Sequence, residues 1–347
     1  MAYRVGIIGC GCMAGYIDDT VQGYEAAILP YCHAAAFQQV DETEVVAAVD
    51  IDAAARERLM SRWGVPRGYQ SYQEMIEAEK PDIVSIATPA TVHAQITIWA
   101  AEHGVKGIYC EKAMCCSLRE ADHMVDAVHG TGVAFNLGTT RRYHPGYHRM
   151  REVIRSGAIG EPKAVVSYPA GTLMFVGSHC FDLMLFLLGD PEVERVQGYL
   201  APGEYDLREN RIGYDPVGGG TIQFRGGAQG HQLMVPGAWD WEVLGTEGAV
   251  RAMNNGIHWS LRAVGPRQGS FVLWEEKGFP AYERFSPTVN LIRDLIHAME
   301  TGEPTLGNVE IARRGMEISI GIAESHRQGS AWVPVPGKNR ELYIVSN

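Results

Sequence analysis

The sequence lacks an excess of positive charge and a long apolar run. Its 347 residues include 30 Lys and Arg but 41 Asp and Glu, so the formal net charge is −11. Because Lys and Arg supply most nucleic-acid affinity by neutralising phosphates, we expect no nucleic-acid partner. No apolar run approaches the roughly 20 residues that span a bilayer, and the start has neither the basic region nor the cleavage site of a signal peptide. We therefore predict a cytoplasmic protein with no membrane partner.

A metal-type arrangement of ligands is also missing. Of the seven cysteines, Cys10-x-Cys12 and the Cys115-Cys116 pair come closest together, and neither has the C-x-x-C spacing of a zinc site. Their odd number suits reduced, buried thiols of a cytosolic chain. His144 and His148 are four residues apart, but Pro145 interrupts the turn and no third ligand is evident. We predict no metal site, and we expect these two histidines to be solvated.

The chain opens on an apolar strand that runs into a glycine-rich turn at residues 3–14. Gly9 permits a tight turn, and Gly11 lets a pyrophosphate approach bare backbone. The small Ala14 lets the next helix pack closely on the sheet, and the phosphates would lie on the N–H groups of that helix. The pattern predicts a dinucleotide-binding turn.

A second buried strand, residues 44–50, ends in Asp50. A carboxylate at this position hydrogen-bonds the ribose hydroxyls of the adenosine in dinucleotide-binding folds. Ile51 follows, where an Arg or Lys would invite a 2′-phosphate. The sequence therefore predicts NAD as the cofactor, with NADP less favoured.

Further strands alternate with helices. The strand at 81–87 ends in Thr88-Pro89, and the strand at 107–110 delivers Glu111-Lys112 at its carboxyl end, where ligands bind in open parallel sheets. Lys112 is thereby placed for chemistry. Six strands predict a doubly wound parallel sheet, the α/β class. The other expected elements are strands at 68–70 and 133–137 and helices at 52–63, 71–79, 94–103 and 118–129.

Some 30 residues separate Ala14 from the second strand, where a single helix should run directly on. We predict an insertion at about residues 15–32. It leaves from the cofactor turn, so it is either a surface elaboration or a flap over the nicotinamide end.

The pattern changes after Thr139, and at 347 residues two domains are expected. We predict a Rossmann domain at 1–138 and a substrate-binding and oligomerisation domain at 139–347. Short strands separated by turns predict a large open, mostly antiparallel sheet in an α+β domain. Its expected strands lie near 164–168, 193–200, 219–225, 230–235, 240–244 and 271–275, and its helices near 148–156, 177–188, 291–301 and 309–328.

Four motifs occur in sequence order along the chain: Gly9-x-Gly11-x-x-Ala14, Thr88-Pro89-x-x-x-His93, Glu111-Lys112, and Gly177-Ser178-His179-x-x-Asp182. With these motifs in this order, the sequence resembles the glucose-fructose oxidoreductase and inositol dehydrogenase (Gfo/Idh/MocA) family over essentially the whole chain. The resemblance implies a two-domain pyridine-nucleotide oxidoreductase whose C-terminal sheet often builds homodimers or homotetramers. It also implies a substrate among the sugars, cyclitols and their derivatives that most members use.

The resemblance also implies roles for individual residues. Lys112 and His179 are the expected acid/base groups for hydride transfer between the nicotinamide and a secondary hydroxyl of a sugar, cyclitol or glycoside. The substrate is expected to meet Lys112, His179, Asp182 and Phe175. The expected cofactor residues are Gly9, Gly11, Met13, Ala14, Asp50, Thr88, Pro89, His93, Glu111, Lys112 and Arg142.

Plainer readings of the same residues stay open. Lys112 also fits a solvated surface lysine, His179 a capping histidine, and Asp182 a carboxylate favoured by the helix macrodipole. The aromatic residues of the second domain fit a sugar platform, but core packing or a subunit interface explains them as well. This aromatic group, with its two histidines, comprises Trp239, Trp241, Trp259, Tyr214, His231 and His258.

The sequence departs from the family pattern at two motif positions, besides the insertion. Ala113 stands where relatives have proline after the lysine. Phe175 stands where many relatives have an Asp, four residues before His179. An apolar ring there favours a glycoside or derivatised sugar, with Asp18, Asp19, Tyr24 and Tyr31 of the insertion in the pocket. The alternatives are a nucleotide-binding regulator without catalysis, and a lyase or epimerase that uses bound NAD transiently.

Overall fold

The computed structural model describes residues 2–203 and 209–346, and its contacts divide the chain into two compact units. The first unit contains the chain up to Tyr143, together with Phe285–Arg313 and Ser346. The second contains His144–Arg284 and Arg314–Val345. The predicted division after residue 138 did not include the return of Phe285–Arg313 to the first unit.

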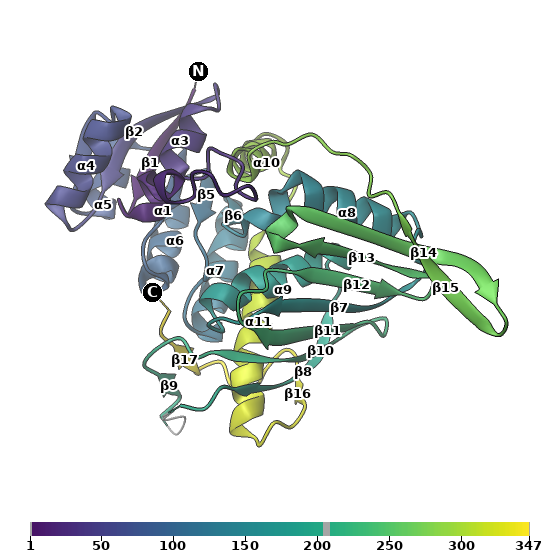
Figure 1. The fold of residues 1–347 in the computed structure, drawn as a ribbon. Helices are drawn as coiled ribbons and strands as arrows, with labels where there is room; N and C mark the ends of the chain where they lie inside the picture. The colour runs from purple at the N-terminus through teal and green to yellow at the C-terminus, as the bar shows by residue number, and fades with distance from the viewer. Residues whose placement is uncertain (1, 204–208, 347) are drawn as a thin grey trace. The chain divides into compact units, whose positions relative to one another are not determined.

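The first unit contains a six-stranded sheet in the order β3-β2-β1-β4-β5-β6 (Figure 1). All neighbouring strands are parallel, as predicted for a doubly wound Rossmann fold. The strand order reverses between β1 and β4, which is the place where open α/β sheets bind ligands. The strands are β1 (Tyr3–Ile8), β2 (Thr43–Val49), β3 (Arg67–Tyr69), β4 (Ile83–Ile86), β5 (Gly107–Cys110) and β6 (Ala134–Leu137).

Polar caps set the limits of the longer helices around this sheet. The side chains of Asp52, Ser71 and Ser117 each accept a backbone N–H at a helix start. Left-handed glycines such as Gly64 and Gly132 end two of these helices. The helices of this unit are α1 (Cys12–Gly15), α2 (Ile17–Thr20), α3 (His33–Gln38), α4 (Ala53–Trp63), α5 (Tyr72–Glu79), α6 (His93–Glu102), α7 (Leu118–Thr131) and α10 (Pro287–Thr301), with 3₁₀ turns η1 (Ala90–Val92) and η2 (Thr140–Tyr143).

Helix α10 belongs to the first unit because of the apolar face that it buries. Leu291, Ile292 and Leu295 are fully buried and share one core cluster with Ile7 of β1 and Ile83 of β4. Burying a leucine or isoleucine side chain contributes roughly 1.5–3 kcal/mol, so this face commits the helix to the Rossmann sheet.

The insertion at residues 15–32 follows the single-turn helix α1, which ends at Gly15, and contains the single-turn helix α2 before the chain continues in α3. One oxygen of Asp18 accepts the N–H groups of Tyr31 and Cys32, at 2.9 and 2.6 Å. Asp19 forms a two-bond ion pair with Arg62 of α4, at 2.6 and 2.7 Å. Asp18 therefore joins the two ends of the insertion, and Asp19 fastens it to the next helix.

The second unit contains a nine-stranded sheet in the order β15-β14-β13-β12-β7-β11-β10-β8-β16. Among the strand pairs that the described residues form in this sheet, only β7–β11 is parallel, as predicted for a mostly antiparallel sheet. The strands are β7 (Pro162–Pro169), β8 (Val193–Leu200), β10 (Gly218–Phe224), β11 (Gln229–Val235), β12 (Trp241–Gly245), β13 (Gly248–Met253), β14 (His258–Gln268), β15 (Phe271–Lys277) and β16 (Val333–Pro334). A separate pair joins β9 (Arg211–Ile212) to β17 (Tyr343–Ile344).

Three long helices accompany this sheet: α8 (Pro145–Arg155), α9 (Phe175–Leu187) and α11 (Val309–Arg327), with the 3₁₀ turn η3 (Asn254–Gly256). Helix α9 packs against β7 and α8 against β13, whereas Ile322 of α11 lies over Gly198 of β8. Three strands of this sheet, β13, β14 and the two-residue β16, have no counterpart in the sequence prediction. Among the helices of the described ranges, none has the length and apolar character needed to cross a membrane.

Candidate cofactor and catalytic site

A cavity of about 420 Å³ opens at the carboxyl ends of β1, β2 and β4. This is the point where the strand order reverses. Of the predicted cofactor residues, five line it: Gly9, Gly11, Asp50, Thr88 and Pro89. The remaining lining residues are Ile8, Val49, Ile51, Gln70, Tyr72, Ala87, Val92, Gln95 and Ile96.

The two glycines of the turn serve different purposes. Gly9 has a φ of +91°, and a Cβ at this position would lie 2.6 Å from the Ala87 carbonyl oxygen. Gly11 has an ordinary φ of −79°, and a Cβ there would meet nothing within 4 Å. Gly9 is thus required by the protein's own backbone, whereas Gly11 leaves open space of the kind a pyrophosphate needs.

Asp50 is held in place by backbone groups. Its two carboxylate oxygens accept the N–H groups of Cys10 and Asp52, at 2.7 and 2.9 Å. Each oxygen keeps a further lone pair for a ribose hydroxyl. The neighbouring Ile51 is 84% exposed, and the Arg56 guanidinium donates to the Asp50 carbonyl at 2.6 Å. Sequence reasoning missed Arg56 as the cation beside this carboxylate.

The Thr88-Pro89 segment lines the cavity. The Thr88 hydroxyl is buried, and among the described residues it has no hydrogen-bond partner. A buried hydroxyl without a partner costs roughly 1–3 kcal/mol, so a ligand that bonded it would relieve that cost. This hydroxyl, the Asp50 carboxylate and the space over Gly11 together fit a dinucleotide.

His93 is not among the residues that line the cavity, and its ring contacts two backbone carbonyl groups instead. Its ring is fully buried, and its two nitrogens lie 2.8 Å from the Ala113 carbonyl oxygen and 2.7 Å from the Thr88 carbonyl oxygen. Burial lowers the pKa of His93. The ring therefore lies between the segment after β4, at Thr88, and the segment after β5, at Ala113, the chain neighbour of Lys112.

Lys112 follows β5 directly and is half-buried, with Glu111 buried before it and Ala113 buried after it. The Lys112–Ala113 peptide bond is cis. Hydrogen bonding from His33, together with the charges of His33 and Lys112, outweighs burial and lowers the pKa of Glu111. The Lys112 ammonium thus has an anion as its chain neighbour.

Glu111 and Lys112, like His93, are not among the residues that line the cavity, and neither are the three remaining predicted cofactor residues, Met13, Ala14 and Arg142. Ala14 is fully buried in the core beneath the turn, which suits close packing of the next helix, and Met13 is half-buried in α1. Helix α1, whose N-terminus was expected to bind the phosphates, is only one turn long. Arg142 is fully buried and donates to the Leu306 carbonyl at 3.2 Å, which joins η2 to the segment after α10.

In the second unit, helix α9 carries His179 and Asp182 one turn apart. His179 is half-buried, and Asp182 is 5% exposed. Three residues of separation place both side chains on the same side of the helix. The arrangement gives an imidazole and a carboxylate on one helix face.

Asp215 places a carboxylate at the start of α9, against the backbone of Phe175. Its oxygens accept the N–H groups of Met174 and Phe175 at the start of α9, both at 2.8 Å. The Leu173 N–H also bonds the Pro216 carbonyl at 2.7 Å, while the Phe175 side chain is 42% exposed. Sequence reasoning missed Asp215, because no spacing pattern connects it to α9.

Residues 3–139 match the model of an oxidoreductase family with an NAD-binding Rossmann fold, GFO_IDH_MocA. This part of the chain, within the first unit, is therefore similar to the Gfo/Idh/MocA oxidoreductases. The match covers the cavity, its glycine turn and Lys112.

Relatives extend this likeness to other parts of the chain. D-apiose dehydrogenase of Paraburkholderia graminis is 30% identical over 46% of this chain and 46% of its own length. Myo-inositol 2-dehydrogenase of Thermotoga maritima is 22% identical over 78% of this chain and 85% of its own. The alignment thus spans about half the length of the first relative. A levoglucosan dehydrogenase solved in complex with NADH has a TM-score of 0.76, with 21% identity over 97% of this chain and 100% of that one, which shows a shared fold.

His144 and His148 are not the solvated surface pair that we expected. Pro145 is the first residue of α8, so it begins this helix and does not interrupt it. His144 is 6% exposed, and its Nδ1 accepts the Gly146 N–H at 3.1 Å, while the half-buried His148 ring lies 4.9 Å from the Phe186 ring. Over the described ranges we find no group of three or more His, Cys, Asp or Glu arranged to hold a metal ion.

The aromatic residues of the second unit pack mainly on one another. Trp241 is fully buried, and the Trp259 ring lies 4.7 Å from Phe279 in a stacked arrangement and 5.2 Å from Tyr147. Tyr214 is exposed. Core packing accounts for Trp241 and Trp259, and burial lowers the pKa of His231.

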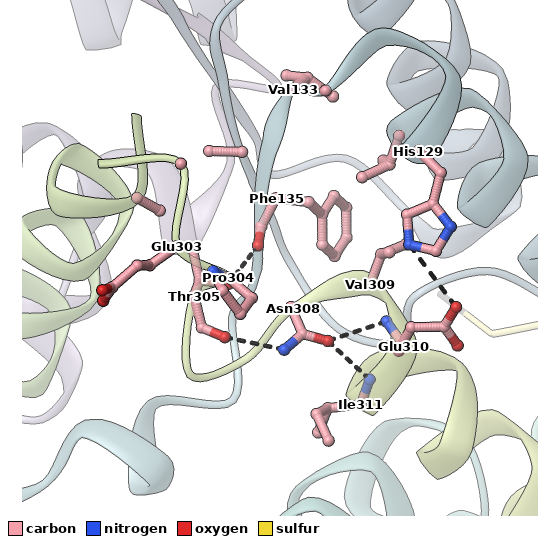
Figure 2. Close-up of a pocket in the computed structure, with 15 residues that line it drawn as sticks. His129, Val133, Phe135, Glu303, Pro304, Thr305, Asn308, Val309, Glu310 and Ile311 are labelled. Atoms are coloured by element: carbon pink, nitrogen blue, oxygen red, sulfur yellow. Dashed lines mark hydrogen bonds and ion pairs between the residues drawn. The ribbon is translucent and has the colours of Figure 1, made fainter. Parts of the chain in front are cut away.

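A second cavity, of about 610 Å³, lies at the opposite end of the Rossmann sheet, beside the start of β6 (Figure 2). Asn308 accepts the N–H groups of Glu310 and Ile311 at the start of α11, and its amide donates to the Thr305 carbonyl. His129 lies 3.7 Å from Glu310. These polar groups bind other protein groups, and the cavity lies at the amino ends of the strands, away from the cofactor end.

Proposed function

We propose that the protein is an NAD-dependent dehydrogenase that acts on a secondary hydroxyl of a sugar, cyclitol or glycoside. The single observation that carries the proposal is the cavity at the carboxyl ends of β1, β2 and β4, with Asp50, the Thr88 hydroxyl and the space over Gly11. The named sugar and inositol dehydrogenases among the relatives support the substrate class.

A bound nicotinamide supplies a two-electron acceptor for the hydride from the carbinol carbon. The chain itself must take the proton of the hydroxyl as the carbonyl forms. We assign this proton transfer to Lys112 and His179, which lie in different units. The position of Lys112 at a strand end and the half-buried imidazole on α9 support the assignment.

The variant Lys112→Ala tests the role of Lys112. We expect it to bind NAD normally and to lose several orders of magnitude in turnover of its best polyol, because no base then replaces the amine. Lys106→Ala is the matched control, since Lys106 is exposed and pairs only on the surface with Asp82. Near-normal turnover of Lys112→Ala would remove this residue from the mechanism.

We further propose a preference for NAD over NADP. The Asp50 carboxylate would repel a 2′-phosphate, and Ile51 offers no cation to bind it. Arg56 is the nearest competing feature, but its guanidinium is engaged with the Asp50 carbonyl. Titrations of both cofactors into the wild type and into Asp50→Ala measure this preference. Tighter NADP binding by the wild type would refute it.

The exposed Phe175 favours a glycoside or derivatised sugar as substrate, in keeping with an apolar neighbour for the sugar's substituent. Within the insertion, Asp18 and Asp19 already serve the protein's own structure, and the Tyr31 hydroxyl lies 3.0 Å from that of Thr140. Tyr24 is 44% exposed and is the better candidate for a substrate contact. Replacing residues 22–28 with a glycine-serine linker keeps Asp18 and Tyr31, and unchanged activity on all substrates would leave the insertion without a role in the pocket.

A polyol and glycoside panel, followed at the absorbance of reduced nicotinamide, separates this function from its alternatives. Net NADH formation supports the dehydrogenase. Product without net NADH supports a lyase or epimerase. NAD binding without turnover supports a non-catalytic regulator, the alternative suggested by Phe175 in place of an acid.

We also propose a homo-oligomer built through the open sheet of the second unit. Strand β15 is exposed along its length, with Phe271 at 73% and Trp274 at 38%, and Val264 of the neighbouring β14 is 46% exposed. Apolar side chains exposed together on a sheet are typical of an interface. Light scattering of the wild type and of Phe271→Glu is the test, and a monomeric wild type would refute the proposal.

A further inference from the structure

A buried polar cluster lies directly before Lys112 in the Rossmann unit. The His33 ring, from the first residue of α3, stacks on Tyr109 with 4.1 Å between centroids and 19° between planes. Its Nδ1 lies 2.7 Å from the Ser85 hydroxyl, and its Nε2 lies 3.0 Å from a Glu111 oxygen. The Tyr109 hydroxyl donates to the same Glu111 oxygen at 3.2 Å.

The cluster joins three separate parts of the sequence at one end of the sheet. Ser85 lies in β4 and Tyr109 in β5, while His33 follows the insertion. His33, Ser85 and Tyr109 are fully buried, and Glu111 is 4% exposed. A charge removed from water this completely needs a partner, because an unpaired buried carboxylate costs several kcal/mol.

The hydrogen-bond roles follow from the carboxylate. Ionised Glu111 only accepts, so His33 Nε2–H donates to it. The Ser85 hydroxyl both donates and accepts, so it bonds Nδ1 whether that nitrogen carries a proton or not. Either charge state of His33 therefore keeps both of its bonds, and the Glu111 carboxylate keeps its donor.

Burial raises the pKa of Glu111, but hydrogen bonding and charge at His33 oppose burial most strongly. The positive charge of Lys112 and the imidazole of His93 act in the same direction, so the pKa of Glu111 is lowered overall. Tyr31 and Tyr143 are further titratable groups near Tyr109. Of these groups, His33 is the one that bonds the carboxylate directly from another element.

We propose that His33 is a positioning residue for Lys112. By holding the Glu111 carboxylate in place directly before Lys112, it makes the orientation and charge of the Lys112 ammonium depend on a side chain of α3. The role of Lys112 in turnover rests on the function proposed above, whereas its coupling to His33 does not.

Two substitutions separate this role from packing. His33→Phe keeps a ring on Tyr109 but removes both nitrogens, and His33→Gln keeps an amide donor for Glu111 and an acceptor for Ser85. We expect His33→Phe to lose at least tenfold in kcat with an unchanged Kd for NAD. We expect His33→Gln to stay within about threefold of the wild type, because one amide hydrogen bond replaces most of the imidazole's.

The pH dependence gives a sharper readout. Without its donor, the buried carboxylate takes up a proton, and Lys112 loses a neighbouring negative charge that favours the ammonium. The acid limb of the kcat profile should therefore move to lower pH by about one unit in His33→Phe, as it should in Glu111→Gln. His103→Phe is the control, since His103 is exposed at the end of α6, and its profile should not move.

A second measurement needs no substrate. The rate at which the Lys112 amine is acetylated by acetic anhydride, followed by peptide mass spectrometry across pH, reports its titration directly. A shift in His33→Phe that His33→Gln lacks supports the coupling even if no polyol is turned over, which would contradict only the proposed function.

Several results would overturn the proposal. One is wild-type kcat and wild-type Lys112 titration in folded His33→Phe. Another is an equal loss in both His33 variants together with a lower Tm and weaker NAD binding, since that pattern reports packing alone. Should His33→Phe fail to fold, His33→Phe/Glu111→Gln leaves no buried carboxylate, and its Lys112 titration should match that of Glu111→Gln. Any additional shift in the double variant contradicts a route through Glu111.

Discussion

Replacing each glycine of the cofactor turn by alanine should separate protein stability from cofactor binding. At Gly9 the φ of +91° lies in a region that costs a side-chain-bearing residue roughly 1–3 kcal/mol. The new Cβ would also lie 2.6 Å from the Ala87 carbonyl oxygen and 2.9 Å from the Thr88 amide nitrogen. Relieving such an overpacked contact costs a further ~1–3 kcal/mol. We expect Gly9→Ala to lose about 2–6 kcal/mol of unfolding free energy, a large part of a typical total of about 5–15 kcal/mol.

At Gly11 the same substitution meets open space, and the φ of −79° suits any residue. The unfolding free energy should change by less than about 1 kcal/mol and in either direction. If the pyrophosphate passes over this backbone, the added methyl group occupies its path. We then expect at least about a tenfold weaker NAD affinity, equivalent to ~1.4 kcal/mol.

Urea unfolding and NAD titration of both variants measure the two effects independently. Gly9→Ala as stable as the wild type would show that the backbone contacts with Ala87 are not limiting. Gly11→Ala with full stability and full NAD affinity would refute the placement of the phosphates, and with it the main support for the cavity as a dinucleotide site.

Three further predictions concern other parts of the chain. Asp215→Ala should lower the unfolding free energy, measured in urea, by about 1–2 kcal/mol, because two N–H groups at the start of α9 lose their acceptor. Asp215→Asn should lose less. Equal stability of the wild type and both variants would contradict this capping role. Burial raises the pKa of Cys10 and of Cys32 to about 12, whereas Cys12 is exposed. Iodoacetamide at pH 8 should therefore label Cys12 before the other two, as followed by peptide mass spectrometry. Equally fast labelling of Cys10 would contradict its burial. Because the pKa of Glu111 is lowered from its usual value of 4.5, its ionisation stabilises the fold at pH values above 4.5. The difference in unfolding free energy between the wild type and Glu111→Gln should therefore shrink as the pH falls through the lowered folded-state pKa. A difference that grows as the pH falls would contradict this prediction.

The Rossmann unit was largely readable from local sequence, because its signals are local. Continuous apolar runs, each followed by polar residues, mark β1, β2, β4 and β5, and caps such as Asp52 mark where helices begin. The carboxyl end of a parallel strand is also where ligands bind, so Asp50 and Thr88 were found in the cavity without any knowledge of their neighbours. Strands β13 and β14 were missed, since their burial patterns are irregular and their pairing partners are set by the sheet.

Tertiary structure alone decided which distant residues meet. Glu111 meets His33 across 78 positions, and Asp215 meets Phe175 across 40. The apolar face of α10 could be predicted, but its commitment to the Rossmann sheet depends on a matching surface elsewhere in the chain. Hydrogen bonds and apolar contacts of this kind form between segments that only folding brings together. The spacing of residues within one segment therefore cannot predict them. The sequence by itself determined the parallel sheet and its carboxyl-end cavity; folding decided that His33 meets Glu111, the residue before Lys112.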